Sequence, residues 1–136
     1  MNQYTKRSLI HALLSLAVIL LGILIFYVVA NSLTEPPTPS TSDEPGAEFG
    51  KLLTALAAGI AILVVGIVDT VFSSFFVYLF AYFSHKNASA AIEEGGEKLA
   101  FPKALKILSL IEMIFSVIIG IVALLLMTGG LTMMAL

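Results

Sequence analysis

Residues 52–83 read LLTALAAGIAILVVGIVDTVFSSFFVYLFAYF and contain a single ionisable side chain, Asp69. A helix that crosses the hydrocarbon core of a bilayer, roughly 30 Å thick, needs about 20 apolar residues. As a straight helix this run would be about 48 Å long. It therefore predicts a transmembrane helix that is tilted, or one that projects into the headgroup layer at one end.

Two further apolar runs flank this stretch. Residues 9–30 contain His11 as their one ionisable side chain, and residues 107–127 contain Glu112. Both runs are long enough to span a bilayer, and lipid leaves the backbone no hydrogen-bond partners outside a helix. The sequence thus predicts an all-α integral membrane protein with three transmembrane helices, at residues 9–30, 52–83 and 105–128.

The composition supports this fold class and excludes several functions. The chain has 136 residues, of which 59% are hydrophobic and 12% charged, against about 45–50% and 25% in globular proteins. A soluble enzyme, a disordered chain and a nucleic-acid-binding domain do not fit these values. The chain has no cysteine, and its two histidines lack the spacing of metal ligands on a helix. We therefore predict no catalytic motif, no metal and no cofactor.

The charged residues predict how the chain threads the membrane. Lysine and arginine are enriched in cytoplasmic segments. Residues 1–8 contain Lys6 and Arg7, and residues 84–106 contain four lysines, whereas residues 31–51 contain four acidic residues and one lysine, and the tail 129–136 carries no charged side chain. We therefore expect residues 1–8 and 84–104 on the cytoplasmic side, and residues 31–51 and 129–136 on the outer side. The expected location is the cell membrane of a prokaryote.

The connecting segments carry their own signals. Residues 31–51 contain four of the five prolines and many Ser and Thr residues, which predicts an extended linker. Residues 89–94 could form a short interfacial helix that ends at Gly95, and Pro102 suits the first turn of the third helix. The inner end of residues 52–83 is rich in aromatic residues, and Tyr78 and Tyr82 favour the membrane interface.

The first 30 residues allow a second interpretation. Lys6 and Arg7, the apolar run and Ala30 together resemble a secretory signal with a small-residue cleavage site. The apolar part of such signals usually spans about 7–15 residues, and this one is longer. We favour an uncleaved anchor. A cleaved signal would leave a two-helix hairpin.

Small and polar residues recur at helical spacing in all three runs. Helices in lipid associate through such residues, because small side chains let the backbones approach and hydroxyl groups bridge them. The pattern predicts packing stripes, which serve either the bundle itself or a docking partner. The packing candidates are Gly22, Gly59, Gly66, Ser116 and Gly120.

Asp69 and Glu112 are the candidates for a functional site within the membrane. A carboxylate at the bilayer centre costs about 2.5–3.5 kcal/mol on insertion scales, and such residues usually face the bundle interior. We expect the two carboxylates to lie roughly 9 Å apart in depth, too far to share a proton. His11 is the basic side chain expected near Glu112, and Ser73 is the hydroxyl expected nearby.

Three thin helices enclose little space, so we expect assembly with another membrane protein or with further copies of this chain. The predicted function is that of an accessory, assembly or structural subunit that docks through its helices. One alternative is a small homo-oligomeric transporter or channel for protons or cations that uses Asp69 and Glu112. A second alternative is a holin-like pore former. The bilayer is the remaining expected partner, and nucleic acid is not one.

Overall fold

The computed structural model describes residues 3–33, 46–95 and 99–135, and all of these are helical except Gly46, Gly95 and Leu99. It forms three helices, α1 (Gln3–Leu33), α2 (Ala47–Glu94) and α3 (Ala100–Ala135). Each of the three is long enough and apolar enough to cross a membrane. The expectation of an all-α protein with three helices suited to spanning a bilayer is therefore confirmed.

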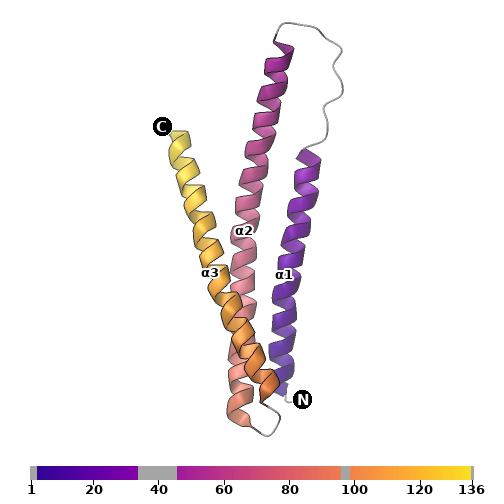
Figure 1. Cartoon of the computed structure of the whole chain (residues 1–136), viewed down its shortest axis with the longest axis vertical. Coiled ribbons are helices and arrows are strands. Elements are labelled where there is room, and N and C mark those ends of the chain that lie inside the picture. The colour runs from indigo at the N-terminus through magenta and orange to yellow at the C-terminus, as the bar shows by residue number, and fades with distance from the viewer. Residues whose placement is uncertain (1–2, 34–45, 96–98, 136) are drawn as a thin grey trace.

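The long helix α2 lies between the other two. α1 and α3 each pack along α2, and they contact each other far less than either contacts α2. Figure 1 shows that the helices converge where α2 connects to α3 and that α1 and α3 diverge toward the opposite end. We call these the closed end and the open end. The N-terminus lies at the closed end, and α3 terminates at the open end (Figure 1).

All three helices exceed the predicted spans. α2 has 48 residues, which corresponds to about 72 Å. Residues 84–94, predicted as part of a loop, continue α2, and residues 100–104 belong to α3. Residues 89–94 are thus not a separate helix. The helix continues because Ser84, Ala88 and Ala91 are buried against the neighbouring helices.

The predicted outer loop is shortened in the same way. Residues 31–33 complete α1 and residues 47–51 begin α2, while residues 34–45 lie outside the described part of the chain. Two glycines bound α2 with positive φ angles that other residues rarely adopt. Gly46 precedes the helix with φ of 100°, and Gly95 follows it with φ of 66°. The predicted helix end at Gly95 is confirmed.

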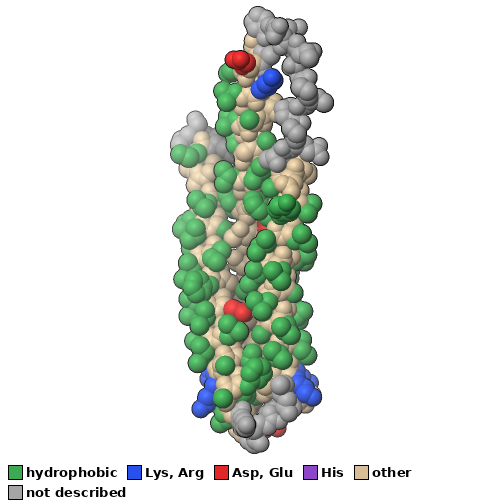
Figure 2. Space-filling view, turned by 45° about the vertical axis from the view of Figure 1, so that its right-hand side comes forward, with side chains coloured by type: hydrophobic (Ala, Val, Ile, Leu, Met, Phe, Trp, Pro, Cys, Tyr) green, Lys and Arg blue, Asp and Glu red, His purple; other side chains and the backbone are tan. Residues whose placement is uncertain are grey.

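The interior of the bundle is made of small side chains. Nearly all buried positions are Ala, Ser, Thr or Gly, while the large aliphatic and aromatic residues face outward. Figure 2 shows the resulting apolar surface along the length of the molecule. This arrangement is typical of helices in lipid, because lipid tails solvate Leu and Ile as well as a protein core would. Close backbone contact therefore takes the place of a large-residue core.

The closed end holds buried contacts between helices. The Ser8 hydroxyl donates to the Ser84 carbonyl oxygen at 2.8 Å, and the Ser84 hydroxyl donates to the Ser8 carbonyl oxygen at 2.9 Å. Both residues are completely buried. Next to them, Ala12 of α1, Ala88 of α2 and Leu105 of α3 form an apolar cluster that joins all three helices.

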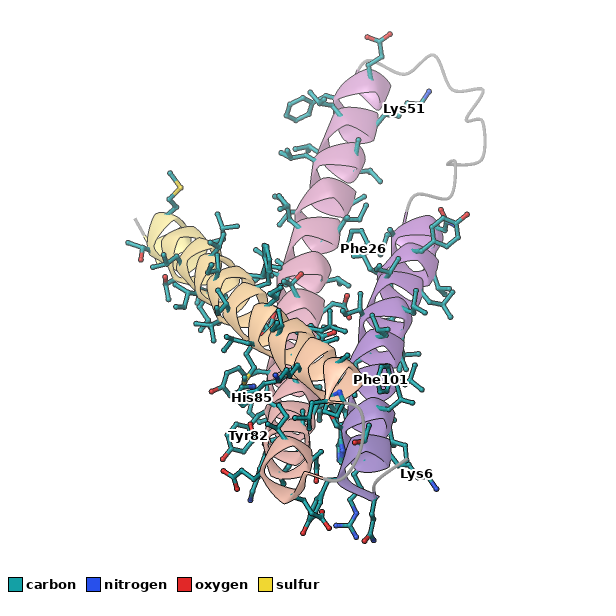
Figure 3. All side chains as sticks on the ribbon, turned by 60° about the horizontal axis from the view of Figure 1, so that its bottom comes forward. Lys6, Phe26, Lys51, Tyr82, His85 and Phe101 are labelled. Carbon is teal, nitrogen blue, oxygen red and sulfur yellow. The ribbon has the colours of Figure 1, made fainter. Side chains whose placement is uncertain are left out.

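Charged side chains gather at the two ends of the molecule. In Figure 2 basic side chains surround the closed end, and one acidic and one basic side chain lie at the tip of the open end. Lys6 and Lys51 lie at opposite ends in Figure 3. On the face that Figure 2 shows, the middle of the molecule carries hydrophobic side chains, a few acidic ones and no basic one. The predicted spans 9–30 and 52–83 contain no lysine or arginine, and the third contains only Lys106, near its start.

Substitution of Ser84 tests the closed-end contact. Ser84→Ala removes the reciprocal hydrogen bonds, and an interhelical bond of this kind contributes about 0.6 kcal/mol on average and at most about 1.7. Ser84→Leu also overfills a site with no space, which costs about 1–3 kcal/mol. We expect the leucine variant to lose more stability than the alanine variant in an SDS titration of the folded protein.

The matched control for this test is Thr128→Leu. Thr128 is exposed, and its hydroxyl bonds to carbonyl oxygens of its own helix. The Thr128→Leu protein should therefore be as stable as the wild type. Equal stability of Ser84→Leu and Thr128→Leu would contradict the close α1–α2 contact.

Candidate functional site

A groove runs over α2 toward the open end, where α1 and α3 separate. Its volume is about 840 Å³, and residues of all three helices line it. Most of the lining is Ile, Leu, Val and Phe. The polar lining residues are Asp69, Thr70, Ser73 and Ser74 of α2, and Glu112 and Ser116 of α3. The groove therefore combines an apolar wall with two carboxylates.

Several of the hydroxyl groups beside the groove are satisfied by their own helix. Thr70 donates to the Gly66 carbonyl oxygen at 2.7 Å, and Ser116 donates to the Met113 carbonyl oxygen at 2.8 Å. Such bonds within a helix leave the hydroxyl hydrogen unavailable to a ligand. The groove thus offers its carboxylates, rather than these hydroxyl groups, as the main polar contacts.

Asp69 faces α1 at the position of Gly22. A Cβ atom built on Gly22 would lie 2.5 Å from the Ser73 hydroxyl oxygen and 3.6 Å from Asp69 Oδ2. Glycine therefore lets the Ser73 hydroxyl approach α1 this closely, whereas a Cβ would make only an ordinary contact with Asp69. Within the described residues, the Asp69 carboxylate has no hydrogen-bond or ion-pair partner. Asp69 is thus a partly buried carboxylate that lines the groove unpaired.

The other packing candidates differ in what they contact. A Cβ on Gly66 would lie 3.0 Å from the Phe26 ring, and one on Gly120 would lie 3.5 Å from Ser74 Cβ. Figure 3 shows Phe26 pointing from α1 toward α2. By contrast, Gly59 is exposed, and a Cβ on it would meet nothing within 4 Å.

Glu112 is bound to α1. The Ser15 hydroxyl donates to Glu112 Oε2 at 2.7 Å, and the same hydroxyl lies 2.7 Å from the Ala12 carbonyl oxygen. One hydroxyl hydrogen cannot serve both acceptors fully. An amide nitrogen in place of Oε2 would donate a hydrogen bond to the Ser15 oxygen. The Ser15 hydroxyl could then donate its own hydrogen to the Ala12 carbonyl oxygen. Ser15 itself is completely buried.

His11 does not pair with Glu112 in the structure. Its Nδ1 lies 2.7 Å from the Arg7 carbonyl oxygen, and since a carbonyl only accepts, Nδ1 carries the hydrogen. Its ring lies 5.5 Å from the Phe83 ring and 6.4 Å from the Phe80 ring, between centroids. The partner expected from sequence is therefore replaced by Ser15, one helical turn further along α1.

The two carboxylates occupy different levels of the bundle. Glu112 contacts α1 at Ser15, and Asp69 approaches α1 at Gly22. Seven residues of helix separate these two positions, which corresponds to about 10 Å. This agrees with the separation expected from sequence. The two groups thus form two sites along the groove rather than one carboxyl pair.

No metal-binding cluster appears within the described residues, since no group of three or more His, Asp or Glu is placed to hold an ion. His85 lies beside α3 (Figure 3), with its Nδ1 3.4 Å from the Lys106 carbonyl oxygen. This contact joins α2 to α3 near the closed end. His85 and His11 both take part in helix packing.

The sequence identified the polar side chains of the site but not the residues to which they bind. Ser8, Ser15 and Gly22 recur every seven residues, which identifies the buried stripe of α1. Nothing in that spacing shows that Ser15 binds Glu112 or that Ser8 binds Ser84. Comparison of the chain with protein-family models, curated proteins and solved structures finds no match.

Two substitutions of Glu112 test its hydrogen bond. Glu112→Gln keeps a group that can donate to Ser15, so we expect unchanged stability in an SDS titration. Glu112→Leu loses the contact and should lower stability by about 0.6–1.7 kcal/mol. Glu93→Leu, at an exposed position near the end of α2, is the control and should have no effect. Equal losses in both Glu112 variants would contradict this account.

Proposed function

We propose that this chain is an accessory or assembly subunit that docks against another membrane protein through the groove. The observation that carries the proposal is the unpaired Asp69 carboxylate in the groove wall. A carboxylate facing lipid in the bilayer is costly, and intramembrane carboxylates normally pair or face a protein interior. A docked partner would cover Asp69 and remove it from lipid.

The shape of the bundle favours docking over transport. The groove opens between α1 and α3, while the apolar cluster of Ala12, Ala88 and Leu105 joins the helices at the closed end. A single chain thus offers no continuous polar passage. Asp69 and Glu112 also lie at different levels, and Glu112 is held by Ser15. A transporter would have to build its pathway between several copies of the chain.

The proposed orientation places the closed end in the cytoplasm. Lys6, Arg7, Lys86, Lys103 and Lys106 all belong to helix segments at that end. Basic residues remain on the cytoplasmic side during insertion. With three crossings, the end of α3 would then lie outside.

Photo-crosslinking from the groove tests the docking function. We expect a photoreactive phenylalanine analogue at Ile23 or Ile119, both of which line the groove, to crosslink in cells to one defined membrane polypeptide. The matched controls are Ile25 and Ile121, which are 46% and 52% exposed but do not line the groove. We expect them to crosslink to lipid alone.

Two results would contradict docking. One is equal crosslinking from the groove and control positions. The other is proton or Na⁺ flux by the purified chain alone in liposomes, abolished by Asp69→Asn, which would support the transporter instead.

Cysteine labelling tests the orientation, because the chain has no native cysteine. We expect Glu48→Cys to react with a membrane-impermeant maleimide on intact cells. Lys6→Cys and Lys103→Cys should react only after the cells are permeabilised, because the closed end would be cytoplasmic. All three positions are exposed. The reverse pattern would show the opposite orientation.

A further inference from the structure

Asp69 identifies the kind of partner that the groove can hold. We propose that the groove receives one transmembrane helix of a second protein, and that this helix carries a lysine or arginine side chain at the level of Asp69. The inference rests on the docking function proposed above and adds to it the chemistry of the partner.

The length of the groove suits a helix. Its wall extends from Ile62 to Val77 on α2 and from Ile111 to Leu126 on α3. Each of these segments is about 22 Å long, or roughly four helical turns. The groove is thus elongated parallel to the helices and open along one side. An apolar helix with one polar side chain matches this shape and lining better than a compact ligand does.

The Asp69 carboxylate of the groove can pair only with a cation from outside the described chain. The nearest lysines along α2 are Lys51 and Lys86, which lie about 27 Å and 26 Å from Asp69 along the helix, and His85 lies about 24 Å away. Glu112, the other carboxylate of the groove, already accepts a hydrogen bond from Ser15. A basic side chain that pairs with Asp69 offsets part of the cost of holding each charge in lipid.

A second copy of this chain does not supply the cation. The basic groups within the predicted spans are His11 and Lys106. Lys106 lies near the start of α3, at the closed end, and the His11 ring packs on Phe80 and Phe83. Phe80 lies 11 residues from Asp69, which is about 16 Å along the helix. A parallel copy in the same membrane would therefore hold its His11 at the wrong depth. The partner is accordingly a different chain.

Probe helices test this inference with the full chain in liposomes. A Leu/Ala transmembrane peptide carries one central Lys and an acceptor dye, and the protein carries a donor dye at Lys103→Cys. The matched peptides have Leu at the centre, or Lys moved seven residues toward one end. We expect the central-Lys peptide to bind the wild-type protein at least about tenfold more tightly than either matched peptide, equivalent to about 1.4 kcal/mol.

Variants of Asp69 supply the specific readout. Asp69→Asn should bind the central-Lys and Leu peptides equally, while Glu93→Gln, at an exposed position outside the groove, should keep the preference for Lys. Asp69→Lys should instead prefer a central-Glu peptide. This reversal keeps the test valid if Asp69→Asn packs poorly, because it demands a gain of binding. Retention of the Lys preference in Asp69→Asn would overturn the inference.

Other occupants of the groove give distinct results. Self-association of the chain that requires Asp69, without preference for the Lys peptide, would show a second copy and overturn the inference. Asp69-dependent binding of tetraphenylphosphonium without that preference would show a small lipophilic cation and also overturn it. Crosslinks from Ile23 and Ile119 to a partner, without preference for the Lys peptide, would overturn the basic partner but leave the docking function intact.

Discussion

Close contact between helix backbones is the constraint on which the rest of this structure depends. Ser8 and Ser84 have no exposed surface and bond to each other's backbone, which is feasible only where two helices nearly touch. In lipid, large apolar side chains gain nothing by leaving the surface, so small residues determine where helices meet. The small residues of the closed end bring all three helices together. Away from it, α1 and α3 separate while α2 continues between them.

The groove is a consequence of that divergence. Gly22 and Gly66 keep α1 close to α2, since a Cβ at either position would press on Ser73 or Phe26. Between α3 and α2, a Cβ on Gly120 would make only an ordinary van der Waals contact with Ser74. α1 and α3 both follow α2, yet they hardly contact each other toward the open end. The space between them exposes a strip of α2 that carries Asp69, Ser73 and Ser74.

Two carboxylates on neighbouring stripes thus receive different environments. Glu112 lies nearer the convergence of the helices, where Ser15 reaches it from α1. Asp69 approaches α1 at a point about 10 Å further along that helix. The residue there is Gly22, which has no side chain that could bind the carboxylate. The first carboxylate serves the packing of the bundle itself. Asp69 has no such partner among the described residues of the bundle. This is the physical basis of the docking function and of the basic partner helix proposed above.

The sequence alone determined the helical class, the number of helices suited to a membrane, the depth difference of the two carboxylates and the helix end at Gly95. These follow from hydropathy, helical rise and backbone preference, which are local properties. The tertiary structure alone decided that Ser15 rather than His11 binds Glu112, that Gly59 packs on no other helix, and that residues 84–94 continue α2. Such outcomes depend on the relative rotation and register of helices far apart in sequence. Spacing along one helix does not determine those.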